Sequence, residues 1–300
     1  MMYRSQFTPQ NALRKSLVIG SLLGLISSNS ALAQLVDIDQ TQWQASGDKF
    51  SCQLRQPLNN GYVEFVARAG YPLAITLVEG DKSSSGSLAV SRLAAPWQNK
   101  DDIEPLGSGD ISPAQPYMNS GTEPLLAGLQ SGNWAQLALT LNQKTRHITL
   151  SNAGIHQPAL DFQGCRNQLL PASYDQVSLV RVQFSSGKNR PQPSYSDTLN
   201  NLAMYVRTDK EITEVHIDGH TDSHGHHLDN LKIAKDRADN VAEYLKYLGV
   251  PEDKIILRYH AERYPIASNN TNYGRAQNRR VEIRLIKQNT PPDQDSFFSP

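Results

Sequence analysis

Charged and amide side chains that could hold a small zwitterion gather in the second half of this 300-residue chain. Gly219-His220-Thr221-Asp222 ends a short apolar run, and Asn230 and Arg237 follow seven residues apart, which places them on nearly one face of a helix. A carboxylate at Asp222 can accept hydrogen bonds from an ammonium group, and the Arg237 guanidinium can bind a carboxylate through two parallel hydrogen bonds. The pair could therefore hold the end of an amino acid. The alternative is an ordinary surface ion pair, which contributes little stability.

Elements that could position these residues alternate along the same part of the chain. Strand-like runs fall at 177–184, 214–218, 255–259 and 281–286, and apolar residues at helical spacing fall within 199–206. The strongest helical pattern steps by three or four through Leu231, Ala234, Ala238, Val241, Leu245 and Leu248, and it ends at Gly249 and Pro251. Strands that alternate with helices predict an α/β sandwich, with helices packed on one side of a sheet.

The first half has a different pattern. Short apolar runs at 62–67, 73–78, 88–93, 134–141 and 147–150 are separated by turn-forming residues, among them the segment 107–116. No helical pattern stands out. We predict an α+β protein overall, with a β-rich, sandwich- or barrel-like domain at 34–168 and an α/β sandwich at 169–288. The last residues, 289–300, hold three prolines and are predicted to be a disordered tail.

The first 33 residues have the pattern of a cleaved export signal. Arg14 and Lys15 precede an apolar run of ten residues at 17–26, and Ala31 and Ala33 form an A-x-A site. The run is about half the length that spans a bilayer, although a retained anchor is the alternative. We expect an exported chain without a transmembrane segment once the signal is removed.

Composition limits the partners and the redox state. Basic and acidic residues number 29 each, and removal of the signal leaves 26 basic against 29 acidic residues, which excludes a basic nucleic-acid-binding protein. The chain has two cysteines, Cys52 and Cys165. An even pair in an oxidising compartment favours a disulfide, and two buried free thiols are the alternative.

Five histidines between residues 216 and 227 raise the question of a metal site. His224-Gly225-His226 resembles the start of an HxHxDH zinc motif, but Leu228 and Asp229 stand where that motif needs Asp and His. A metal-dependent hydrolase that uses this loop is therefore the least favoured alternative. We find no G-x-S-x-G segment or other catalytic grouping, and we expect neither enzymatic activity, a metal nor a cofactor.

Several motifs in a fixed order resemble the OmpA-like peptidoglycan-binding domain across residues 175–287. They are Gly219-His220-Thr221-Asp222, Asn230, Arg237-Ala238, Tyr264-Pro265, N-x-T-x-x-G-R at 269–275 and NRRVE at 278–282. The resemblance implies the OmpA-like α/β fold and binding of the free diaminopimelate end of a peptidoglycan stem peptide. One departure is Ala234, because the family usually has Ser three residues before the arginine.

The resemblance also implies roles for individual residues. Asp222 and Arg237 correspond to the two ligand-binding residues, and Thr221 and Asn230 belong to the same peptidoglycan-binding motifs. Arg279 and Arg280 are expected to support the site.

Shorter segments of the first half resemble the periplasmic T-ring proteins of polar flagella. They are Cys52-Gln53-Leu54, VEFVARA at 63–69, Ala95-Pro96-Trp97 and the segment from Cys165 to Leu170. Both cysteines fall where that family places its disulfide. The resemblance implies a periplasmic protein of the flagellar motor whose first domain docks to the basal body, in the region of the T, P and L rings, beside other T-ring or stator subunits. A general OmpA-like envelope anchor with a non-flagellar partner is the alternative.

Overall fold

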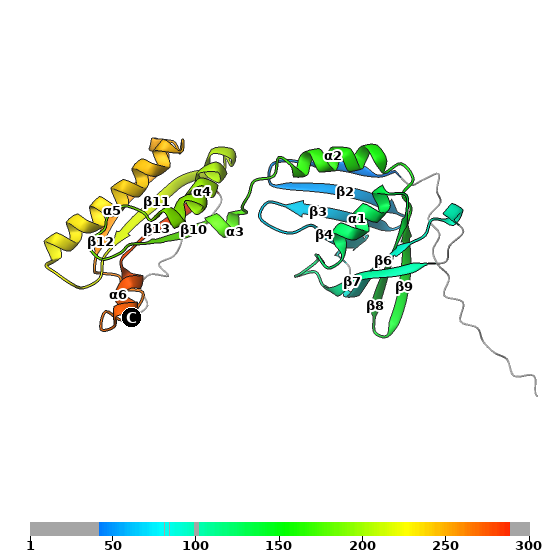
Figure 1. Cartoon of the computed structure of the whole chain (residues 1–300), viewed down its shortest axis with the longest axis horizontal. Coiled ribbons are helices and arrows are strands. Elements are labelled where there is room, and N and C mark those ends of the chain that lie inside the picture. Colours follow the sequence, from blue (N-terminus) through cyan, green and yellow to red (C-terminus); the bar gives the residue numbers. More distant parts are fainter. Residues whose placement is uncertain (1–41, 81, 84, 99–101, 289–300) are drawn as a thin grey trace, which may run out of the picture. The chain divides into compact units, whose positions relative to one another are not determined.

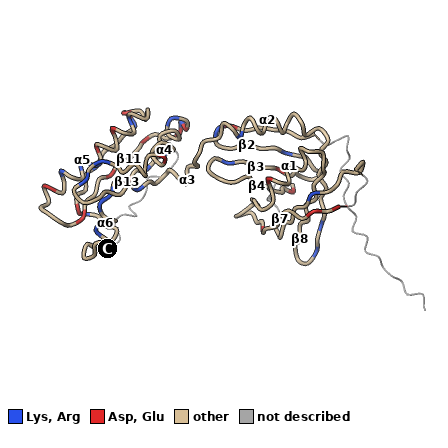
Figure 2. The backbone as a smooth tube through the Cα atoms, in the orientation of Figure 1, with Lys and Arg blue, Asp and Glu red and all other residues tan. Residues whose placement is uncertain are grey.

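The computed structural model describes residues 42–80, 82–83, 85–98 and 102–288 (Figure 1). The predicted export signal (1–33) and the whole predicted tail (289–300) lie outside these ranges. Helices and strands are mixed along the chain, which confirms the α+β class. Figure 2 shows basic and acidic residues interspersed along both halves. Over the described ranges, no helix has both the length and the apolar character needed to cross a bilayer.

Two open antiparallel sheets build the first half. The first has the order β1-β2-β3-β4-β5, and its strands are β1 (Gln44–Gly47), β2 (Ser51–Leu58), β3 (Gly61–Arg68), β4 (Ala74–Glu79) and β5 (Lys82–Ser83). The second has the order β7-β6-β8-β9, and its strands are β6 (Gly86–Leu93), β7 (Ile103–Ile111), β8 (Trp134–Leu141) and β9 (Lys144–Leu150). The predicted β-rich fold is confirmed, and neither sheet closes into a barrel within the described residues.

One hydrophobic core joins both sheets. Along β8, Ala135, Leu137 and Leu139 are buried and alternate with less buried neighbours, as a half-buried strand requires. Val63 and Phe65 of β3 face the same core. Asn142 and Gln143 turn the chain between β8 and β9 with positive φ angles of 51° and 63°, the conformation that a two-residue hairpin turn needs.

The prediction that this half lacks helices is wrong, because it contains α1 (Thr122–Gln130) and α2 (His156–Arg166). α1 contributes Leu125, Leu126 and Leu129 to the core, and α2 contributes Ala159 and Phe162. With only two buried residues in eleven, α2 carries too weak an apolar period for its sequence to reveal a helix.

The turn region predicted at 107–116 is wrong for its first five residues, because β7 continues to Ile111, whereas 112–116 lie outside the strands. Glycine is needed at position 107 of that strand because the loop at Ser120 comes very close to it. A Cβ atom there would be 2.4 Å from Ser120 Oγ.

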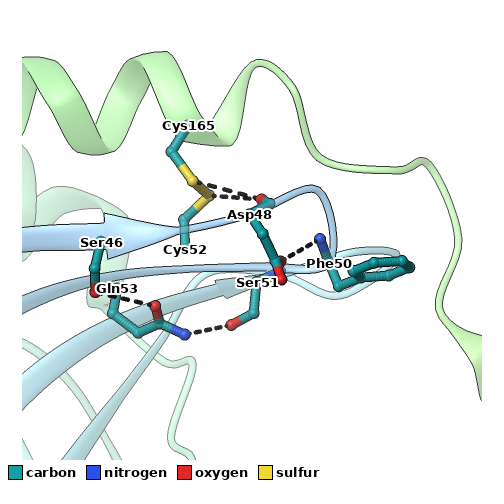
Figure 3. Close-up of a disulfide and its surroundings, with 7 residues drawn as sticks. All are labelled: Ser46, Asp48, Phe50, Ser51, Cys52, Gln53 and Cys165. Carbon is teal, nitrogen blue, oxygen red and sulfur yellow. Dashed lines mark hydrogen bonds between the residues drawn. A yellow bond between two sulfur atoms is a disulfide. The ribbon is translucent and has the colours of Figure 1, made fainter. Parts of the chain in front are cut away.

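A disulfide links Cys52 in β2 to Cys165 in α2 (Figure 3), which confirms the predicted pairing. The two Cα atoms are 6.0 Å apart, a usual separation for this bond. Helix α2 packs on β1 and β2, and the bond ties this helix to β2.

The second half is a four-stranded sheet with the order β10-β13-β11-β12. Its strands are β10 (Leu179–Gln183), β11 (Ile212–His220), β12 (Ile255–Ala261) and β13 (Arg280–Lys287), and its helices are α3 (Tyr174–Val177), α4 (Ser196–Thr208), α5 (His227–Tyr247) and α6 (Asn272–Asn278). Strands β11 and β12 are parallel, and the other neighbours are antiparallel. Buried residues of α4 and α5 share one core with the strands. The predicted α/β sandwich is confirmed, whereas the domain boundaries stay predictions.

Helix α5 packs on the sheet through the predicted apolar stripe. Ala238, Val241 and Leu245 are fully buried. The helix ends at Gly249, whose φ is 88°, and Val250 N–H donates to Leu245 O at 3.0 Å, as in a Schellman motif. Leu231, the first member of the predicted stripe, is 36% exposed, so the buried face begins one turn later than the pattern indicates.

Candidate functional site

The loop that follows β11 is held close to α5. A Cβ atom on Gly219 would lie 2.3 Å from Ala234 O, so only glycine allows the strand and the helix to approach this closely. Thr221 N–H donates to Ala261 O at 2.8 Å, which fixes the chain as it leaves the strand. Asp222 therefore follows directly from a rigid strand end.

The carboxylate of Asp222 is oriented by two donors. Arg279 Nη1 lies 2.7 Å from Oδ2, and His224 N–H donates to Oδ1 at 3.2 Å. Arg279 comes close to Asp222 because of the register between β11 and β13. The two strands are antiparallel and Gly219 lies opposite Val281, so the residues just after Gly219 lie beside those just before Val281. Asp222 is only 8% exposed.

Arg237 is the largest fully buried side chain among the described residues, at 1% exposure. Its Nε donates to Lys188 O at 2.9 Å, and its Nη1 donates to His220 O at 3.2 Å. Burial lowers the pKa of Arg237 to about 10, with a further contribution from the positive charge of Arg279. The guanidinium therefore keeps its charge at neutral pH.

Asp222, Arg237 and Arg279 together carry two positive charges and one negative charge. Asp222 pairs with Arg279 rather than with Arg237, so the described residues do not form the ordinary Asp222–Arg237 ion pair that the sequence left open. The surplus positive charge favours a ligand carboxylate, and a charged acceptor such as Asp222 favours an ammonium group. The cluster suits a zwitterion.

Thr221 and Asn230 are both buried. Thr221 directly precedes Asp222 in the strand-end loop, and Asn230 lies in the first turn of α5. Thr221 Oγ1 has no hydrogen-bond partner within the part of the chain that the structure describes. Helix α5 begins at His227, and the side chain of its N-cap residue, His226, forms no capping hydrogen bond with the described part of the chain. Its first-turn N–H groups are therefore available to an anion, with the helix dipole adding to the attraction.

The N-x-T-x-x-G-R motif builds the loop opposite. Asn269 Oδ1 accepts from Ser223 N–H at 3.3 Å and from Asn278 Nδ2 at 2.9 Å, which ties this loop to the strand-end loop. Arg275 Nη1 donates to Asn269 O at 2.7 Å, and Thr271 Oγ1 caps α6 by accepting from Gly274 N–H at 3.0 Å. These motif residues act by shaping the loop.

Arg280, unlike Arg279, points into the structure. It is buried, its Nε lies 2.8 Å from Glu282 Oε1, and its Nη2 donates to Tyr264 O at 3.2 Å. The pKa of Glu282 is lowered: burial acts in the opposite direction, but the hydrogen bond and charge of Arg280 outweigh it. The structure therefore places the two neighbouring arginines in different environments.

A histidine pair that sequence reasoning missed lies under the same strand end. The rings of His220 and His260 stack at 4.9 Å, and His260 Nε2 is 2.8 Å from Asp218 Oδ1. Burial lowers the pKa of His220 to about 3, so this ring is neutral at physiological pH. His224 and His226 are exposed, and no group of three or more His, Cys, Asp or Glu residues in the described ranges is arranged to hold a metal ion.

Backbone groups complete the site, and sequence inspection could not find them. The carbonyls of Lys188 and Phe184 hold Arg237 and Arg279. A carbonyl is present at every residue, so only the folded position of the loop after β10 identifies these acceptors.

Two family models match the chain. The MotY N-terminal domain matches residues 35–171, and the OmpA family matches residues 183–279. The second match contains Asp222, Arg237 and Arg279.

Individual proteins are also similar to this chain, over nearly its whole length or over a part of it. The sodium-type flagellar protein MotY of Vibrio parahaemolyticus is 22% identical over 280 residues, which cover 89% of this chain and 96% of that protein. Outer membrane protein A of Bordetella avium is 35% identical over 138 residues, 43% of this chain and 71% of that protein. The crystal structure of the peptidoglycan-associated lipoprotein from Burkholderia pseudomallei matches with 26% identity and a TM-score of 0.34, covering 35% of this chain and 89% of that one. The chain therefore belongs to the OmpA family, as a MotY-like member with a MotY N-terminal domain ahead of its OmpA-family domain.

Proposed function

We propose that the second half of the chain binds peptidoglycan through the free end of diaminopimelate in a stem peptide. That end carries an ammonium group and a carboxylate on one carbon atom. Asp222 accepts hydrogen bonds from the ammonium group, and Arg237 binds the carboxylate. The observation that carries the proposal is the cluster of buried Asp222 and Arg237 with partly buried Arg279, which has an excess of one positive charge.

The contacts of each side chain fit this assignment. Arg237 uses Nε and Nη1 for backbone carbonyls, which leaves Nη2 for a ligand within the described surroundings. A bound carboxylate also offsets the repulsion between Arg237 and Arg279. Thr221 Oγ1, which lacks a partner in the described part of the chain, supplies a further hydrogen bond. Asn230 helps to shape the site, and Arg280 supports it from the core.

Co-sedimentation with purified sacculi tests this proposal. Asp222→Asn preserves the shape of the side chain and removes its charge, so we expect it to abolish sedimentation with the sacculi while the far-UV circular dichroism spectrum is unchanged. Lys232→Gln, an exposed charge change on α5, is the matched control and should sediment like the unmodified protein. Full sedimentation of the Asp222 variant would overturn the assignment.

We further propose that the whole chain is a non-enzymatic periplasmic protein of the flagellar motor, in the T ring. The first half docks to the basal body and to other T-ring or stator subunits, and the second half attaches the ring to the cell wall. The MotY N-terminal match and the near full-length similarity to a flagellar MotY protein support this role. Many modest attachments around a ring add up by multivalency, so a motor that exerts torque gains a stationary support.

A deletion strain tests the motor role. We expect flagella to be present but paralysed or weakly motile, with motility restored by the gene in trans. Normal swimming, together with intact sacculus binding by the protein, would favour the general envelope anchor instead. Cell fractionation with N-terminal sequencing tests export: the proposal expects a periplasmic protein that begins at Gln34.

A further inference from the structure

A groove opens beside the proposed peptide site, between α4, α5 and the segment that precedes α4. Its volume is about 510 Å³. Arg190 and Gln192 line it from the preceding segment, and Asn240, Glu243 and Tyr244 line it from α5. Leu199 of α4 forms part of its floor. We refer to this pocket as the α4–α5 groove.

The groove and the peptide site share one wall. Arg237 Nε donates to Lys188 O, and one turn later Asn240 Nδ2 donates to the next carbonyl along, Asn189 O, at 3.0 Å. The backbone at 188–189 is thus fixed to α5 at both positions. The next residue along this backbone, Arg190, lines the groove, so the backbone leads from the contact with Arg237 to the groove.

The spacing along α5 matches the chemistry of the polymer. Arg237 and Tyr244 are seven residues apart, so they share a helix face and are about 10.5 Å apart along the axis. Diaminopimelate is the third residue of a stem peptide, and three extended residues alone span about 10 Å; the γ-linked glutamate and the side chain that carries the free end add to this reach. A stem held by Arg237 can therefore place its sugar at the level of Tyr244.

The lining has the mixed character that a sugar requires. Asn240 Nδ2 donates to Asn189 O and Asp236 O, so its Oδ1 is the atom that can accept from a hydroxyl or N-acetyl group. Glu243 pairs with Lys246 through Oε1, and its second carboxylate oxygen can accept as well. Tyr244 of the lining is half-buried, and its ring stacks on that of Tyr247 with 6.4 Å between centroids. Tyr247 is not itself a lining residue, but it is 84% exposed and offers an apolar face next to the lining. Arg190 is exposed and forms no ion pair with any described residue, so its donors are available to a ligand.

We propose that the α4–α5 groove is a second subsite, which binds the N-acetylated disaccharide that carries the stem peptide. This inference rests on the proposed peptidoglycan binding by Asp222 and Arg237. Its consequence is that the protein binds a sugar-bearing stem more tightly than the peptide alone.

Isothermal titration of the full exported chain with two soluble probes tests the inference. The probes are the tripeptide L-Ala-γ-D-Glu-diaminopimelate and the same tripeptide on its N-acetylglucosamine–N-acetylmuramic acid disaccharide. We expect the disaccharide probe to bind about tenfold more tightly. Arg190→Ala and Tyr247→Ala, both at exposed positions, should remove most of this difference and leave the dissociation constant for the tripeptide unchanged. Arg258→Ala, an exposed arginine of β12 outside the groove, is the control and should behave like the unmodified protein.

The outcomes separate the two proposals. Equal affinity for both probes, or a difference that survives Arg190→Ala and Tyr247→Ala, overturns the sugar subsite while peptide binding stands. If the tripeptide does not bind at all, the proposed function fails, and the subsite fails with it.

Discussion

Arg279 Nη1 lies 2.7 Å from Asp222 Oδ2, whereas Arg237 bonds to backbone carbonyls on either side of the same site. The two arginines thus have separate tasks. In the proposed binding mode, Arg279 orients the carboxylate that meets the ammonium group, and Arg237 presents a fixed positive charge to the ligand carboxylate. This division explains how one acidic and two basic residues can hold a zwitterion without neutralising one another.

Arg279→Gln should weaken peptide binding while the fold is retained. The variant loses the charged partner that orients Asp222, so we expect the dissociation constant for the diaminopimelate tripeptide to rise about tenfold. Isothermal titration measures it, and Arg258→Gln is the exposed control. An unchanged constant would show that the Asp222–Arg279 contact does not serve binding.

Arg280→Met should act on stability instead. It leaves Glu282 buried without its main partner, and breaking a buried pair costs about 3–5 kcal/mol. Arg181 Nε, 3.1 Å from Glu282 Oε1, should keep the loss near the lower end. Urea unfolding measures the change, and the double variant Arg280→Met/Glu282→Leu should recover most of it. A single variant as stable as the unmodified protein would contradict the structural role.

His220 should make the stability of the fold depend on pH. Its pKa falls from an ordinary 6.5 to about 3 because burial disfavours the charged ring. Between these values the unfolded chain binds the extra proton, so stability falls as pH drops from 6.5 towards 3, by about 1.4 kcal/mol per pH unit. Thermal unfolding between pH 7 and pH 4.5 should show a smaller slope for His220→Gln than for His224→Gln, an exposed control. Equal slopes for both variants would count against a neutral buried ring.

Removal of the disulfide should destabilise the first half. The bond closes a loop with a sequence separation of 113 residues, and the chain-entropy model gives about 4–5 kcal/mol for a loop of this size. Cys52→Ser/Cys165→Ser should therefore lower the unfolding midpoint of the first half and leave tripeptide binding intact. Reductant should lower the midpoint of the unmodified protein and have no effect on the double variant. Equal midpoints with and without the bond would contradict this account.

Strong periodic patterns made much of the fold predictable from the sequence. Strand β8 and helix α5 follow patterns that their buried residues explain. Helix α2 was missed because only Ala159 and Phe162 are buried in it, so its stability depends on contacts with β1 and β2 that no local pattern records.

The candidate site was predictable only in part, for a similar reason. Motif order predicts Asp222 and Arg237 as ligand-binding residues, which stays a prediction. The Asp222–Arg279 contact could not be predicted, because it joins residues 57 positions apart and depends on the register between β11 and β13. Motif order also grouped Arg279 with Arg280, although neighbouring residues at a strand start point to opposite faces. Only the structure assigns the first to Asp222 and the second to the core.

Titration of the diaminopimelate tripeptide into the unmodified protein and into Asp222→Asn tests whether Asp222 and Arg237 hold the two ends of the zwitterion. In a second tripeptide, the diaminopimelate carboxylate on the carbon that carries the free ammonium group is amidated, which removes the group assigned to Arg237. We expect either change alone to weaken binding by about tenfold or more, since each removes one charged contact. If the asparagine variant and the amidated peptide both bind as tightly as the unmodified pair, this cluster does not recognise the zwitterion.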